Sequence, residues 1–170
     1  MNNTAKLPYA FDTGDVARKL IPGLSSLTAI VVGFGLIKFL FVVPSIPAAL
    51  GIIVIGGMLS AFCYIIIKKL GGASGTISHS EIVVTPHVFF GIASDSAAGT
   101  FAITRFQSLL VEEMLWAAQR YSPHERVSLV SKDQALDILI ARTQRGAGLT
   151  LARELGALLN LRVEEKQMPY

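Results

Sequence analysis

The strongest candidate for binding chemistry is a short stretch of arginines and glycines before a predicted helix. Arg142 and Arg145 are followed by Gly146, Ala147 and Gly148, and we expect the helix to begin immediately afterwards. Helix N-termini carry free N–H groups that attract anions, so these residues suit a phosphorylated lipid headgroup or an acidic loop of a partner. A glycine-rich turn with solvated arginines has the same composition, and both interpretations stay open.

Other residue types with catalytic or metal-binding potential are poorly spaced. The three histidines are scattered along the chain: His79, His87 and His124. With one cysteine, Cys63, neither a disulfide within the chain nor a metal site is expected. The pairs Glu112–Glu113 and Glu164–Glu165 would point to opposite faces of a strand, which does not suit shared acid–base work. We therefore expect a protein that is not an enzyme and has no metal and no cofactor.

The elements that position these residues begin with an apolar run of 44 residues, Leu24 to Ile67. One helix of that length would reach about 66 Å, roughly twice the ~30 Å hydrocarbon layer of a membrane. Pro44 and Pro47 divide the run, because each removes a backbone donor and disfavours helix at the preceding residue. The sequence therefore predicts a transmembrane hairpin of two helices, residues 24–43 and 48–67.

Positive charge flanks this hairpin on one side. Basic residues precede the first crossing and follow the second, and the turn between the crossings has none: Lys6, Arg18, Lys19, Lys68 and Lys69. The positive-inside rule then places both termini and the soluble part in the cytoplasm of a bacterium, or in the stroma if the membrane is a thylakoid. From Leu70 onward the chain has nine Lys and Arg and ten Asp and Glu, so no nucleic-acid partner is expected.

Lys38 is the only charged residue within the run. A charge in a crossing commonly marks an ion path or a buried partner. Lys38 lies five residues from the predicted end of its helix, however, so its stem can carry the ammonium group to the interface. We favour this snorkelling. The alternative function is a small transporter or channel subunit, in which oligomerised hairpins form a pore lined by Lys38.

The second crossing carries four small residues that form two pairs four positions apart: Gly56, Gly57, Ser60 and Ala61. Small residues at this spacing let another helix backbone approach closely. The first crossing, with Gly33 and Gly35, is one candidate neighbour. A helix of another integral membrane protein is equally compatible with the pattern.

The remaining chain divides around the hairpin. Residues 1–23 are predicted to be a short polar cytoplasmic lead, interpreted as a frayed terminus in preference to a surface helix over Asp15–Ile21. Residues 68–75, which include Gly71–Gly75, are predicted to be a flexible linker. Residues 76–170 are long enough for one small soluble core.

The pattern of this soluble part predicts an α+β domain. β-formers fill 81–93 around Pro86, and Arg126–Val130 with Ala135–Ala141 is typical of a hairpin. The segment 107–121 has features of both helix and strand, and we favour strand. A helical stripe then closes the domain: Leu151, Ala152, Leu155, Leu158 and Leu159.

The whole arrangement resembles the bacterial PH-like membrane proteins, which have two N-terminal crossings and a PH-type domain. Phe101–Glu112 is similar to the family's apolar-then-polar strand, and Arg126–Ala141 to its paired strands before the helix. The resemblance implies an antiparallel β-sandwich or partial barrel, closed by the C-terminal helix, that holds peptides at an edge or open end. Some assembly factors of photosynthetic membrane complexes are similar in architecture.

Together these features favour a non-enzymatic, membrane-anchored interaction module. We expect it to be a subunit or assembly factor of a larger photosynthetic or respiratory membrane complex. Its expected partners are other integral membrane proteins, the lipid bilayer and anionic headgroups.

Overall fold

The computed structural model describes residues 5–41, 45–114, 124–133 and 136–166. The chain forms two compact units. The helical unit comprises Gly14–Gly71 and Val88–Asp95, and the sheet unit comprises Met1–Thr13, Gly72–His87 and Ser96–Tyr170. The chain therefore passes from one unit to the other four times.

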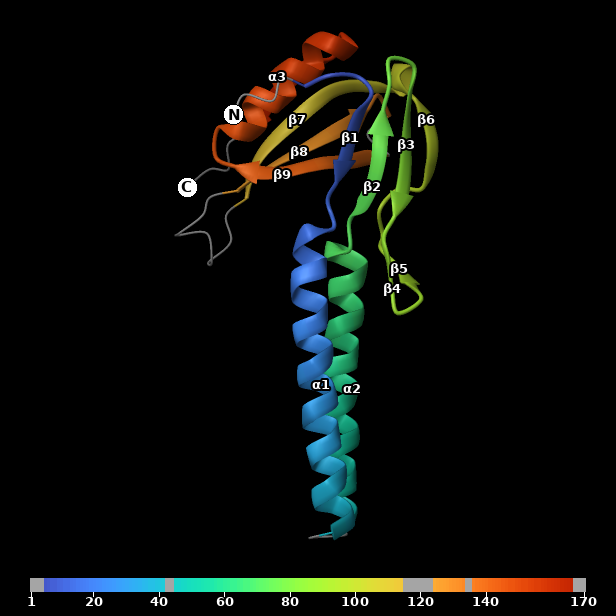
Figure 1. Ribbon diagram of the computed structural model, residues 1–170, viewed down its shortest axis with the longest axis vertical. Helices are drawn as coiled ribbons and strands as arrows, with labels where there is room; N and C mark the ends of the chain where they lie inside the picture. The colour runs from blue at the N-terminus through green and yellow to red at the C-terminus, as the bar shows by residue number, and fades with distance from the viewer. Residues whose placement is uncertain (1–4, 42–44, 115–123, 134–135, 167–170) are drawn as a thin grey trace. The chain divides into compact units, whose positions relative to one another are not determined.

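Two long helices dominate the helical unit: α1 (Asp15–Phe41) and α2 (Ile46–Leu70) (Figure 1). Both are long and apolar enough to cross a membrane, and only 6% of an apolar 18-residue stretch in each helix is buried. Ser45 caps α2, since its Oγ accepts the N–H of Ala48 at 3.4 Å, and Pro47 lies in the first turn, where its missing N–H is least costly. The predicted division of the run into two helices is confirmed.

The first helix begins earlier than the apolar run. Residues 15–23 belong to α1 although Pro22 lies among them, so the predicted frayed terminus is wrong for this stretch. A single proline removes one backbone hydrogen bond, and the rest of a long helix can absorb that loss.

A two-stranded hairpin completes the helical unit. Its strands are β4 (Val88–Phe89) and β5 (Ile92–Ala93), with Val88 opposite Ala93 and Phe89 opposite Ile92. The turn residues Phe90 and Gly91 have φ values of 52° and 78°. Phe89 and Ile92 pack against a small buried cluster on the helices: Ala17, Ile21 and Ile67.

The first sheet of the sheet unit is antiparallel, in the order β1-β2-β3-β6. Its strands are β1 (Tyr9–Asp12), β2 (Ala73–Ile77), β3 (Glu81–Pro86) and β6 (Gly99–Ala102). Residues 9–12 are thus a paired strand, where the sequence predicts a frayed terminus. The predicted linker is likewise wrong for residues 73–75, which belong to β2.

The second sheet has the order β10-β7-β8-β9. Its strands are β7 (Phe106–Met114), β8 (His124–Ser131), β9 (Asp137–Gln144) and β10 (Arg162–Lys166), and a 3₁₀ turn, η1 (Ile103–Arg105), leads into β7. β7, β8 and β9 are antiparallel, and β10 is parallel to β7. The predicted hairpin over 126–141 is confirmed as β8–β9. The preference for strand over 107–121 is confirmed as far as residue 114, and residues 115–121 lie outside the described part.

The C-terminal helix, α3 (Ala147–Leu159), packs along the second sheet (Figure 1). Its buried residues include Ala152, Leu155 and Leu159 of the predicted stripe, whereas Leu158 is 39% exposed. α3 is not the last element, because β10 follows it. Both sheets and α3 share one apolar core, which includes Ile82, Leu109 and Leu129. In the described part of the chain the two sheets remain separate and do not close into a barrel.

Candidate functional site

The N-terminus of α3 is already occupied by a carboxylate of the protein itself. Glu125, a largely buried residue of β8, accepts the N–H of Gly146 at 2.6 Å with one oxygen. Its other oxygen accepts the N–H groups of Gly148 at 2.8 Å and Leu149 at 3.2 Å. Glu125 therefore serves as the helix cap and balances the positive end of the helix dipole. The predicted anion site assumed free N–H groups here, and that premise is wrong for these three positions.

Gly146 and Gly148 are required for different reasons. Gly146 has a φ of 83°, a left-handed conformation that bulkier residues rarely adopt. A Cβ on Gly148 would lie 2.7 Å from the Glu125 Oε2 atom and 2.7 Å from the Thr143 hydroxyl. Gly148 therefore reflects the close approach of an internal carboxylate, and Gly146 reflects a left-handed turn.

The two arginines of the predicted site are engaged separately. Arg145 Nε lies 3.4 Å from Glu113 Oε1, and Arg142 Nη1 donates to the backbone carbonyl of Thr13 at 3.2 Å. A polar cavity of about 50 Å³ lies beside Arg145 and is lined by Val111, Glu113, Glu125, Glu165 and Lys166. Its size suits one or two water molecules. Among the described residues, no group of three His, Cys, Asp or Glu side chains is placed to hold a metal ion.

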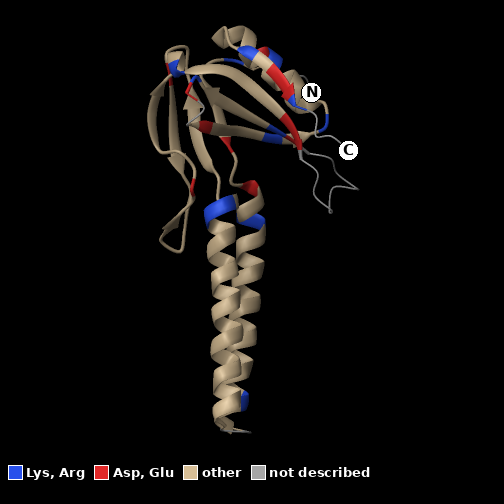
Figure 2. Ribbon diagram, turned by 180° about the vertical axis from the view of Figure 1, so that it is seen from behind, with Lys and Arg blue, Asp and Glu red and all other residues tan. Residues whose placement is uncertain are grey.

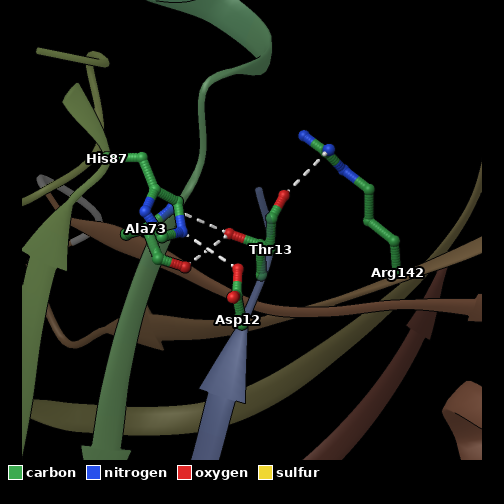
Figure 3. A network of polar contacts seen from close by, with 5 residues as sticks. All are labelled: Asp12, Thr13, Ala73, His87 and Arg142. Carbon is green, nitrogen blue, oxygen red and sulfur yellow. Dashed lines mark hydrogen bonds and ion pairs between the residues drawn. The ribbon is translucent and has the colours of Figure 1, made fainter. Parts of the chain in front are cut away.

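A second polar cluster, which the sequence does not reveal, centres on Thr13 (Figure 3). Thr13 is only 1% exposed. Its hydroxyl donates to the carbonyl of Ala73 at 3.0 Å and accepts the Ala73 N–H at 3.0 Å, and its own N–H donates to the same carbonyl at 2.9 Å. In Figure 3 Thr13 lies between Ala73 and the guanidinium of Arg142. The cluster therefore ties together three segments that are far apart in the sequence.

The neighbouring residues extend this cluster. His87 Nε2 lies 2.9 Å from Asp12 Oδ1, and the His87 N–H donates to the Gly72 carbonyl at 3.1 Å. Gly72 has a φ of 68°, and a Cβ there would lie 2.5 Å from the Thr13 carbonyl oxygen. Thr13, Gly72 and His87 are each the sheet-unit residue at a passage of the chain to or from the helical unit. The cluster thus contains the sheet-unit residue at three of the four points where the chain changes units.

The four small residues of α2 divide between two faces. A Cβ on Gly56 would lie 3.1 Å from Val32 Cγ2, and one on Gly35 would lie 2.9 Å from Ile52 Cγ1. Gly56 therefore lies at the contact between α1 and α2. Beside it is an apolar cavity of about 230 Å³, bounded by residues of both helices: Val31, Val32, Gly35, Ala48, Gly51, Ile52, Ile55 and Gly56.

The other three small residues face away from α1. Gly57 has no atom within 4 Å of an added Cβ, and Gly57, Ser60 and Ala61 are all exposed. The predicted face for helix packing is thus split. One glycine serves the hairpin itself, and three neighbouring small residues form an outward face, which we name the small-residue face.

Lys38 lies near the other end of α1. Its side chain is exposed, and its ammonium nitrogen is 5.5 Å from the centroid of the Phe34 ring. This distance fits a cation–π contact between two residues one helical turn apart.

No protein-family model, curated protein or solved structure is significantly similar to this chain, so its function is inferred from its own residues.

Proposed function

We propose that the protein is a non-enzymatic, membrane-anchored interaction module that acts as a subunit or assembly factor of a larger membrane protein complex. In this proposal α1 and α2 cross the membrane as a hairpin. The sheet unit is a PH-like domain on the cytoplasmic or stromal side, and the small-residue face binds a transmembrane helix of another integral membrane protein.

Membrane insertion is supported by the surface of the two helices. Large apolar side chains are exposed along both, including Ile30 at 67%, Ile53 at 69% and Met58 at 69%. The core helix of a soluble protein would bury such side chains, whereas hydrocarbon accepts them. The basic residues at the start of α1 and the end of α2 agree with insertion from one side.

The hairpin topology is supported by the pairing of β1 with β2. β1 precedes α1 and β2 follows α2, and their register runs from Tyr9 opposite Ile77 to Asp12 opposite Ser74. Strands can pair only on the same side of a membrane. An even number of crossings between them is therefore required, as a two-helix hairpin provides.

A PH-like domain is supported by two antiparallel-rich sheets that share one core with a C-terminal helix. The parallel strand β10 after α3 is an addition to that plan.

The observation that carries the proposal is the small-residue face. α1 packs on the Gly56 side of α2 and leaves Gly57, Ser60 and Ala61 exposed. Lipid tails can pack against large side chains. A second helix, in contrast, packs closely only where the side chains between the two backbones are small, because helix association in membranes depends on close packing. The contact between Lys38 and Phe34 near the helix end favours an anchoring role over a pore.

The test compares two exposed glycines, one inside and one outside the small-residue face. Gly57 and Gly23 are each exposed with no atom near an added Cβ, and only Gly57 belongs to the small-residue face. After gentle detergent extraction, native gels should show the wild type and Gly23→Leu in one complex with a second membrane protein. Gly57→Leu should release the chain from it.

Two results would contradict this proposal. One is a wild-type protein that migrates as a monomer with no co-purifying protein. The other is equal loss of the complex in Gly23→Leu and Gly57→Leu. A complex that contains only this chain would identify the partner helix as a second copy and would refute the assignment to a larger heteromeric assembly.

A further inference from the structure

The β4–β5 hairpin is apolar on both of its faces. The six residues Val88–Ala93 include no polar side chain. Phe89 and Ile92 cover the cluster on the helices, while Val88 is 61% exposed on the opposite face and Phe90 is 73% exposed at the tip. A hairpin with one face on a core and one face in water normally alternates apolar and polar residues. The outward face of this hairpin therefore does not have the composition of a water-exposed surface.

Its position in the helical unit is fixed by contacts to the end of α2. The N–H of Asp95 donates to the carbonyl of Lys68 at 2.9 Å. The Asp95 carboxylate lies 3.2 Å from the ammonium of Lys68 and 3.7 Å from that of Lys69. These lysines come directly after the apolar run, so they mark the level where hydrocarbon gives way to headgroups.

The figures show the same arrangement within this unit. The β4–β5 hairpin lies beside the end of the two helices that is nearest to β2 in the chain, and its turn points along them (Figure 1). Basic residues gather at this helix end (Figure 2). The exposed apolar tip is therefore carried next to the lysines, on the side of the apolar helix surface.

The backbone of the tip adds a separate observation. A two-residue turn with positive φ at both positions favours Asn-Gly or Gly-Gly. Here Phe90 has a φ of 52°, an unfavourable conformation for a bulky side chain. An aromatic ring is thus held at the tip against local backbone preference. Strain of this kind commonly accompanies a functional requirement for the side chain.

We propose that the β4–β5 hairpin inserts into the interfacial layer of the lipid bilayer, with the rings and methyl groups of Phe90 and Val88 among the upper acyl chains. This inference rests on the proposed membrane insertion of α1 and α2. Aromatic side chains favour this layer of a membrane. The hairpin then acts as a third membrane contact, a non-spanning wedge beside the two crossings, and lipid covers its outward face.

The test measures depth with a fluorophore that reports the polarity around it. The full chain, with Cys63→Ser, is placed in vesicles of phosphatidylcholine and phosphatidylglycerol. The dye is attached through Phe90→Cys, through Met58→Cys at the exposed middle of α2, or through Ser80→Cys in the exposed turn between β2 and β3. Nitroxide groups on the lipid chains, either shallow or deep, then quench the emission.

The proposal expects three different results. The dye at position 90 should lose more emission with the shallow nitroxide than with the deep one. The dye at position 58 should show the reverse order, and the dye at position 80 should be quenched by neither. A dye at position 90 that behaves like the one at position 80 would overturn the wedge while leaving the crossings intact. Failure of quenching at position 58 would instead overturn the proposed membrane insertion.

A label-free measurement guards against disturbance by the dye. Phe90→Trp in a Trp116→Phe background keeps an aromatic ring at the tip. Its tryptophan emission should shift to shorter wavelength when the protein is in vesicles. The reference is the same protein kept in solution by a polymer, without detergent or lipid. The absence of a shift would count against the wedge.

Discussion

The sheet unit buries large apolar side chains, whereas the helical unit exposes them. In the sheet unit Ile82, Leu109 and Leu129 are completely buried. In the helical unit Ile53 and Met58 are more than two-thirds exposed. Burial from water stabilises the first arrangement, whereas under the proposed insertion hydrocarbon around the helices removes that driving force. The proposed insertion therefore gives one chain two regions whose stability depends on different solvents.

Polar groups follow the same division. In the sheet unit the carboxylate of Glu125 and the hydroxyl of Thr13 are buried and hydrogen-bonded to backbone groups. In the helical unit charged residues are found toward the helix ends, at Lys38 and at Lys68–Lys69. Substitutions should therefore be costly inside the sheet unit and mild on the helix surface, and three predictions follow this contrast from the largest effect to the smallest.

The largest effect is expected for Leu129→Ala. Leu129 is 0% exposed in the shared core, so truncation should lower the free energy of unfolding by about 3 kcal/mol. Met58→Ala, on the exposed surface of α2, should change it by less than about 0.5 kcal/mol. Denaturant unfolding of the full chain in mild detergent, followed by circular dichroism of the strands, measures both. Equal losses would mean that the two units do not differ in solvent.

An intermediate effect is expected for Glu125→Ala. This change leaves three N–H groups at the start of α3 without their acceptor and should cost about 2 kcal/mol, the range for hydrogen bonds to a charged group. Glu164→Ala is the control, because Glu164 forms only a distant ion pair with Arg162 at 3.9 Å and should lose less than about 0.5 kcal/mol. The same unfolding assay applies. A neutral Glu125→Ala would show that the cap contributes nothing.

The smallest effect is expected for Thr13→Val, which keeps the shape of the side chain but removes the hydroxyl. The Ala73 N–H loses its acceptor, so the sheet unit should be destabilised by about 1 kcal/mol. Thr13→Ser keeps the hydroxyl and should retain most of that stability. Amide hydrogen exchange at Ala73 is the sharper readout: it should speed up in Thr13→Val and stay slow in Thr13→Ser. Unchanged exchange in both variants would show that the Thr13 hydroxyl does not stabilise the sheet unit at Ala73.

The helices could be predicted because apolarity over twenty residues has few other causes. Their ends could not be predicted, since the apolar run is shorter than the two helices that contain it. Asp15–Gly23 and Lys68–Leu70 are helical outside the apolar run. Strands β8 and β9 could be predicted because they alternate apolar residues over a shared core.

Two of the edge strands, β1 and β10, carry no such signal. β1 has four residues, and its partner β2 lies on the far side of both helices in the sequence. β10 is the segment Arg-Val-Glu-Glu-Lys, whose single apolar residue gives no alternation, and its pairing with β7 is parallel. Pairings between distant segments are decided by the assembled core, which a local pattern does not contain.

The sequence predicts the start of the C-terminal helix closely, but it does not predict what occupies the N–H groups there. Arg145 and Gly146 precede the helix as predicted, whereas α3 begins at Ala147 and therefore includes Gly148. The acceptor for its N–H groups, however, is Glu125, which lies on the adjoining strand. A carboxylate more than twenty residues upstream has no sequence mark that distinguishes it from any other glutamate.

The order of β1, α1, α2 and β2 along the chain has a consequence for biosynthesis. β1 leaves the ribosome first, but its partner strand emerges only after both long helices have been made. Under the proposed insertion, a chain with just one helix across the membrane would keep the two strands on opposite sides. The first sheet would then remain incomplete and its core exposed to proteases. Completion of this sheet therefore acts as a checkpoint that reports whether both helices have been inserted.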